Sequence, residues 1–173
     1  MPGSDVAPVL TTSRYTLRAH MAEDLDAVAA LWGDEAVVRH ISGVPSTRDE
    51  AWGRLLRYRG TWAVRGYGFW LVEETATGRF VGEVGFLDAL RGLDPAPEGI
   101  EAGWVLSPAF WGVGAAKETV AAALAWSDEA YGAPHWCLIA PENTGSIRVA
   151  AASGFGDQRE VAFKDRTALL LRR

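Results

Sequence analysis

The sequence predicts a mixed α/β fold, with a central mixed sheet and helices on both of its faces. Strand-like and helix-like segments are interspersed without strict alternation, which argues against a plain doubly wound parallel sheet. With 173 residues, 49% of them hydrophobic, the chain is long enough for one well-buried core and short for two domains. We therefore expect a single domain over residues 11–173, preceded by a flexible N-terminal tail at residues 1–10 that is rich in Pro, Gly, Ser and Asp.

The first half of the chain combines helical patterns with strand-like runs. Ser46, with the acid Asp49 three residues later, predicts the N-cap of a helix. Two apolar runs separated by the turn at residues 75–78 are typical of a hairpin. In chain order, this half predicts a strand at 14–18, a helix from about residue 23, a short turn at 37–41, a helix from 46, and hairpin strands at 69–74 and 79–87.

The second half contains the clearest loop and the clearest turn. Pro95 and Pro97 predict a loop at residues 91–99, because two prolines in three positions forbid both a helix and a central strand. A glycine turn at residues 112–114 then joins a strand-like run to a helical pattern. In chain order, this half predicts a strand at 100–106, a helix from 116 to about 131, a strand at 136–140, a helix at 145–152, and strands at 158–164 and 166–172.

Composition excludes several classes of function. The net charge of −5 and the pI near 5.2 argue against a general binder of nucleic acid or of a membrane surface, since either needs a basic footprint. No apolar run is long enough to span a bilayer and no export signal is visible, so we expect a cytoplasmic protein. The single cysteine, Cys137, lies in an apolar run and is expected to be a buried hydrophobe. With only three scattered histidines, no metal site is predicted.

The glycine turn is the strongest candidate for a binding site. A glycine-rich turn that leads into a helix presents unpaired backbone N–H groups and the positive end of the helix dipole at one point, where an anion can bind. On these grounds alone, a tight connection that binds no ligand explains the turn as well as an anion site does. A Walker A motif is absent, and a dinucleotide fingerprint is excluded because Lys117 stands where its third glycine is needed.

The context of this turn resembles a known family. Residues 103–118, Gly-Trp-Val-Leu-Ser-Pro-Ala-Phe-Trp-Gly-Val-Gly-Ala-Ala-Lys-Glu, are similar to the acetyl-CoA pyrophosphate loop of the GNAT superfamily, in the branch related to ribosomal-protein-alanine N-acetyltransferases. That branch shows Trp-Gly-x-Gly-aromatic-Ala, and here Ala115 replaces the aromatic residue. A second segment, residues 141–150 followed by Gly154 and Phe155, resembles the Pro-x-Asn-x-x-Ser…Gly-Phe signature of the same branch.

The resemblance implies a GNAT-like fold and a cosubstrate. The fold would have a mostly antiparallel sheet of about six to seven strands that splays at the cofactor site, and the cosubstrate would be acetyl-CoA, with no metal. Asn143 would bind the pantetheine arm, although an ordinary helix N-cap is the alternative for this residue. The other cofactor-binding residues implied are Trp104, Val105 and Leu106, through backbone groups of the strand, and Trp111, Gly112, Val113, Gly114, Ala115 and Ala116 in the pyrophosphate loop.

Amide formation needs a neutral amine, a stabilised oxyanion and a proton for the departing thiolate. Candidates for the base are Glu101, which precedes the cofactor-binding strand segment, and Glu83, which lies in an otherwise apolar strand. For both, a rim carboxylate or a buried ion-pair partner is the alternative. Ser146 matches the serine that the resemblance assigns to the leaving thiolate, and its alternative is an ordinary first-turn serine. Trp52, Trp62 and Trp70 flank the segment that covers the acceptor site in the family the sequence resembles, so some of them are candidates for the wall of an acceptor pocket.

These observations predict an acetyl-CoA-dependent N-acetyltransferase that transfers acetyl directly to a primary amine. The acceptor would be a protein N-terminus or a small-molecule amine. Two alternatives are a non-catalytic acyl-CoA-binding regulatory module, and a purely structural domain. No nucleic-acid or membrane partner is expected, and a homodimer is left open. Acceptor specificity resides in loops and side chains without a fixed code, so the sequence does not name the acceptor.

Overall fold

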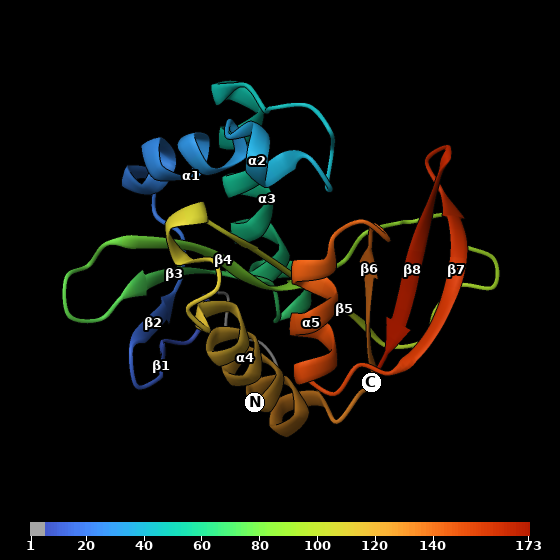
Figure 1. Ribbon diagram of the computed structural model, residues 1–173. Coiled ribbons are helices and arrows are strands. Elements are labelled where there is room, and N and C mark those ends of the chain that lie inside the picture. Colours follow the sequence, from blue (N-terminus) through green and yellow to red (C-terminus); the bar gives the residue numbers. More distant parts are fainter. Residues whose placement is uncertain (1–5) are drawn as a thin grey trace.

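The computed structural model describes residues 6–173, in which eight strands form one sheet (Figure 1). Their order across the sheet is β1-β2-β3-β4-β5-β6-β8-β7, and every neighbouring pair is antiparallel except β5 and β6, which are parallel. This confirms the expected mixed, mostly antiparallel sheet, with one strand more than the six to seven expected. The strands are β1 (Leu10–Thr11), β2 (Tyr15–Arg18), β3 (Phe69–Glu74), β4 (Phe80–Leu87), β5 (Ile100–Leu106), β6 (His135–Ile139), β7 (Asp157–Phe163) and β8 (Arg166–Arg172).

The helices cover both faces of the sheet, as expected. In Figure 1, α4 and α5 lie together in front of the sheet, and α1 to α3 form a separate group. The two groups bury different clusters of apolar side chains: α4 and α5 cover the larger one, while α1 to α3 pack over Phe80 and Val105 of the sheet. The helices are η1 (Ala22–Asp24), α1 (Leu25–Trp32), α2 (Glu35–Val38), α3 (Arg48–Arg65), η2 (Pro108–Phe110), α4 (Ala115–Tyr131) and α5 (Thr144–Ala152), where η marks a 3-10 helix.

The start of α3 differs by one residue from the sequence prediction. Thr47, not Ser46, is the N-cap, and its hydroxyl accepts a hydrogen bond from the backbone N–H of Glu50. The carboxylate of Glu50 in turn accepts from the backbone N–H of Thr47, at 2.7 Å. Both residues suit a capping box equally well by type, and the reciprocal bond to Glu50 selects Thr47 over Ser46.

Part of the expected N-terminal tail packs against the domain. Residues 1–5 lie outside the described part of the chain, but Ala7 is 5% exposed and the carbonyl of Pro8 accepts a 2.7 Å hydrogen bond from Nε1 of Trp70. Leu10 pairs with Leu17 in β1 and β2. The ordered domain therefore begins before residue 11, because Trp70 needs a hydrogen-bond acceptor and the edge of β2 accepts another strand.

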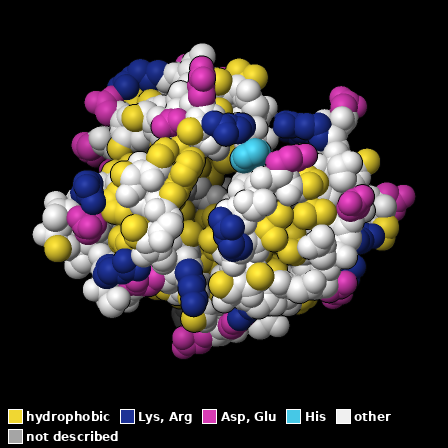
Figure 2. Space-filling model, in the orientation of Figure 1, with side chains coloured by type: hydrophobic (Ala, Val, Ile, Leu, Met, Phe, Trp, Pro, Cys, Tyr) yellow, Lys and Arg dark blue, Asp and Glu magenta, His cyan; other side chains and the backbone are white. Residues whose placement is uncertain are grey.

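The sheet splits between β5 and β6. The two strands pair only at Ile100 with His135 and at Glu101 with Trp136, after which β6 continues its pairing with β8. The other edge of β5 stays paired with β4 as far as Leu106. Residues 102–106 therefore present one edge that no strand covers, which confirms the expected splay. Figure 2 shows a hollow in the surface between η2 and α5, with hydrophobic side chains along it.

Candidate active site

The glycine turn lies at the open end of this split. Gly112 and Gly114 have φ angles of +73° and +81°, in the left-handed region that glycine adopts without strain, and α4 begins at the next residue. Within the described chain, no backbone N–H of residues 112–117 donates a short, well-aligned hydrogen bond. These groups and the dipole of the 17-residue helix α4 form a concentrated positive site for an anion.

Arg14 and Glu118 fix the turn to the edge of the sheet. The guanidinium of Arg14 donates to the carbonyl of Val113 at 3.0 Å and to Glu118 at 2.8 Å, and Ser13 also donates to Glu118. Burial acts to raise the pKa of Glu118, but hydrogen bonds from Thr12, Arg14 and Ser13 together lower it to about 2. Glu118 is therefore ionised at neutral pH, and a cation is held beside the turn at residues 112–114.

The side chains expected along the rest of the cofactor path lie on the two sides of the split. Nε1 of Trp111 donates to the carbonyl of Leu106 at 2.8 Å, which connects the turn to the end of β5. Trp104 contacts the ring of Phe155, which follows α5. Asn143 is the N-cap of α5, and its Oδ1 accepts from the backbone N–H of Ser146 at 3.1 Å.

The N-cap role therefore holds for Asn143, and it leaves the amide N–H₂ group of this side chain without a partner among residues 6–173. The hydroxyl of Ser146 is likewise without a hydrogen bond within that range, and its residue is half-buried. Both side chains remain able to bind a ligand. Ala115 is buried in the core, so its backbone N–H is the group it can offer.

Glu101 lies where β5 and β6 part. Its carboxylate is 4% exposed and accepts two hydrogen bonds from Arg91, at 2.9 and 2.5 Å. Burial raises the pKa of Glu101 above its ordinary value, although the hydrogen bonds and charge of Arg91 act in the opposite direction. Arg91 comes from the proline-containing loop and also lies over the ring of Phe163 in β7, 5.3 Å from its centroid.

Glu83 occupies a different environment, on the face of β4 that α1 and α3 cover. It is completely buried, and its two carboxylate oxygens are bound by Nε2 of His20 at 2.9 Å and by Nε1 of Trp32 at 2.7 Å. This is the alternative of a buried partner that the sequence left open. Both oxygens of this carboxylate are occupied and none of it is exposed, although its partner His20 lines a cavity beside α3.

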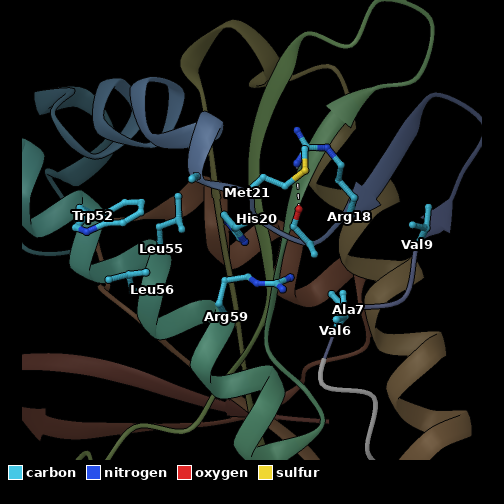
Figure 3. A pocket seen from close by; sticks show the side chains of 12 residues that line it. Val6, Ala7, Val9, Arg18, His20, Met21, Trp52, Leu55, Leu56 and Arg59 are labelled. Carbon is cyan, nitrogen blue, oxygen red and sulfur yellow. Dashed lines mark hydrogen bonds between the residues drawn. The ribbon is translucent and has the colours of Figure 1, made fainter.

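The remaining aromatic candidates are structural or lie elsewhere. Trp62 is buried at 1% exposure, and its Nε1 donates to the carbonyl of Phe69. Trp52 lines a cavity of about 550 Å³ between α3 and the N-terminal segment, shown in Figure 3. In that view the side chain of Arg59 extends from α3 toward Ala7. This cavity borders β2, three strands away from the split, and neither Trp62 nor the buried Trp70 lines it.

The sequence did not indicate which residues form hydrogen bonds with the candidate site residues. These residues contact the candidates from 10 to 104 positions away in the chain, and they are Arg14, Arg91, His20 and Trp32. A buried carboxylate requires a hydrogen-bond donor, so the sequence indicated weakly that Arg, His or Trp side chains would lie near Glu83 and Glu101. Which donor it receives depends on the tertiary structure.

Comparisons with known proteins agree with this geometry. Residues 14–156 match the family model described as an acetyltransferase (GNAT) domain. A GnaT-family acetyltransferase from Bordetella pertussis is similar at 32% identity and a TM-score of 0.84, over 96% of this chain and 99% of that one. An acetyltransferase from Agrobacterium tumefaciens is similar at 25% identity and a TM-score of 0.83, over 96% and 94%. The ribosomal-protein-S5-alanine acetyltransferase from Vibrio fischeri shares the fold, at 18% identity, a TM-score of 0.72 and 96% of each chain.

The chain belongs to the GNAT acetyltransferase family, and its fold and family support an N-acetyltransferase. Members of this family use acetyl-CoA. Within residues 6–173, no helix is both long and apolar enough to cross a membrane. In the same range, no group of three or more His, Cys, Asp or Glu residues is arranged to hold a metal ion.

Proposed function

We propose that the protein transfers the acetyl group of acetyl-CoA directly to a primary amine, at the split between β5 and β6. The observation that carries this proposal is the set of unpaired N–H groups of residues 112–117 at the open end of an uncovered strand edge. The pyrophosphate would bind these groups. The pantetheine arm would follow residues 104–106 of β5, with the amide of Asn143 on its other side.

In this arrangement Glu101 is the better placed of the two carboxylates. It lies at the closed end of the split, whereas Glu83 lies beneath α1 and is enclosed. The amine nitrogen attacks the thioester carbon and loses a proton to Glu101, directly or through a water. The C–S bond then breaks, and the hydroxyl of Ser146 supplies or orients a proton for the thiolate. Glu83 holds His20 and Trp32 in place and has a structural role.

One observation favours a second candidate, a module that binds acyl-CoA without turnover. Both oxygens of Glu101 are already bound by Arg91, so the base must exchange partners before it can accept a proton. The family assignment favours the enzyme over this module. A cytoplasmic location remains part of the proposal and rests on the sequence alone, and the sequence leaves a homodimer open.

The test is incubation with acetyl-CoA and a panel of amines that includes short peptides with free N-termini and small primary amines. The proposal expects release of free CoA together with an acceptor that is 42 mass units heavier, which is about the mass of an acetyl group less one hydrogen. Binding of CoA without release above background for every amine would favour the non-catalytic module. Absence of CoA binding would exclude both candidates.

A further inference from the structure

The two flanks of α3 carry different side chains. Trp52, Leu55, Leu56 and Arg59 face the cavity beside the N-terminal segment. The opposite flank borders a second cavity, of about 500 Å³, between α3 and the loop that precedes it. Its lining is more polar than that of the first cavity and includes two arginines. The residues are Ser42, Val44, Pro45, Ser46, Glu50, Gly53, Arg54 and Arg57.

Arg54 is held in place but not neutralised. Its guanidinium stacks 3.5 Å from the ring centroid of Trp32, whose Nε1 is in turn bound to Glu83. The Nε atom of Arg54 is buried and has no hydrogen-bond partner in residues 6–173. Stacking through the face of a guanidinium leaves its in-plane N–H groups available, and apart from the one that bonds the side chain of Tyr58 they can bind a planar anion.

No carboxylate in the described chain forms an ion pair with Arg54 or Arg57. Glu50, the acid that lines this cavity, uses its carboxylate on the backbone N–H and hydroxyl of Thr47 to cap α3. Glu50 keeps its negative charge and interacts with Arg54 electrostatically, but two guanidinium groups against one carboxylate still leave the cavity with a net positive charge. That charge attracts an anion into the cavity.

This cavity lies on the face of the sheet that α1 to α3 cover. Arg54, which lines it, stacks on Trp32, and Trp32 binds Glu83 of β4. Ser42, which also lines it, accepts a hydrogen bond of 3.4 Å at its carbonyl from Arg166 at the start of β8. The cavity lining is therefore connected to β4 and to β8, which lie on opposite sides of the split.

We propose that Arg54 and Arg57 bind a carboxylate carried by the acceptor, so that the preferred acceptor is a primary amine with an acidic group. This inference rests on the proposed acetyl transfer. The two arginines also disfavour polyamines, because a second ammonium group in this cavity would meet charges of its own sign. The carboxylate belongs to a small amino acid or to an acidic residue near a peptide N-terminus.

The test compares acceptors that differ only in this charge. Peptides with Asp or Glu at the second or third position are paired with their Asn or Gln counterparts, and small amino acids are paired with their amides. The carboxylate form is expected to have a kcat/KM roughly tenfold to a hundredfold higher, mainly through KM, as for a charge-assisted hydrogen bond. Which pair responds more strongly distinguishes a peptide from a small-molecule acceptor.

Arg54→Gln and Arg57→Gln should each remove most of this preference, while the KM for acetyl-CoA stays unchanged. Arg54→Lys should restore part of it by keeping the charge. Arg59→Gln is the matched control, since it removes the same charge from the other flank of the same helix and should leave the preference intact. Thermal unfolding of each variant verifies that it is folded.

Equal kcat/KM values for the acid and its amide would overturn the inference while leaving acetyl transfer in place. A preference that survives in Arg54→Gln and Arg57→Gln, or that Arg59→Gln abolishes equally, would also overturn it. If no amine of either charge is acetylated, the proposed function itself fails and the inference fails with it. A panel in which polyamines are the best acceptors would contradict the inference alone.

Discussion

In the proposed arrangement, the donor side of the split relies mainly on backbone amides, whereas the acceptor side relies on side chains held in pairs. Residues 112–117 offer N–H groups that need only glycine at two positions and a helix behind them. Glu101 depends on Arg91, and Arg54 depends on Trp32. The donor side should therefore respond to changes in backbone conformation, and the acceptor side to changes in charge and in partners.

The largest effect is expected from removing the carboxylate at the closed end of the split. Glu101→Gln should lower kcat about a hundredfold or more, as for loss of a general base, and leave the KM for acetyl-CoA nearly unchanged. Glu83→Gln should leave kcat per folded molecule within about twofold, because Glu83 is enclosed. Steady-state kinetics of the two variants make this comparison, and equal losses of kcat would contradict the assignment of Glu101.

The pH dependence of kcat/KM independently tests whether Glu101 is the base. Because burial raises its pKa, kcat/KM should fall as the pH drops through a value above the ordinary range of glutamate, where the base becomes protonated. Arg91→Gln removes the hydrogen bonds and the charge that lower this pKa, so the acidic limb should move to still higher pH. A limb that stays in place in Arg91→Gln, or that persists in Glu101→Gln, would show that another group titrates.

On the donor side, Gly114→Val should raise the KM for acetyl-CoA by a factor of tens. A β-branched residue at a φ of +81° is strained by about 1–2 kcal/mol, and the turn would rotate its N–H groups away from the phosphates. Gly78→Val is the matched control, because Gly78 has a φ of +69° in the turn between β3 and β4, and a Cβ there meets no atom within 4 Å. Gly78→Val should lower stability by a similar amount and leave the KM for acetyl-CoA unchanged. If it raises this KM as much as Gly114→Val does, general destabilisation is the cause.

A smaller effect is expected at Arg14. Arg14→Gln frees the carbonyl of Val113 and removes a cation beside the turn, so the KM for acetyl-CoA should rise several-fold. A truncated thioester such as acetyl-pantetheine, which lacks the pyrophosphate, should show no such change. If both thioesters are affected equally, Arg14 stabilises the fold at large and not the phosphate-binding turn.

The smallest change in activity, but a measurable change in stability, is expected at Glu118. Its folded pKa of about 2 lies below the ordinary value, so the stability it contributes is present above the unfolded pKa and is lost as the pH falls toward 2. Glu118→Gln should therefore lower the free energy of unfolding by about 1 kcal/mol at pH 7 and by less near pH 3. Urea unfolding at the two pH values measures this, and an equal loss at both would rule out the ionised carboxylate as the cause.

The same contrast explains how much the sequence could predict. The turn at residues 112–114 and the cap at Asn143 are local features that spacing and residue type reveal, and the splay followed from the family resemblance. Glu83 and Glu101 stood out as acids in apolar strands, but they could not be separated, because the difference between them lies in contacts with His20, Trp32 and Arg91. The packing of residues 7–10 against the sheet could not be predicted, because Pro8 and Trp70 meet only in the folded chain.

The central claim is direct acetyl transfer at the split, and mass spectrometry of an acceptor amine incubated with the protein and acetyl-CoA tests it most directly. We expect one acetyl group on the amine, in an amount equal to the CoA released, and a rate that falls about a hundredfold or more in Glu101→Gln. Tight binding of acetyl-CoA with no acetylated product from any amine, acidic or not, would contradict it.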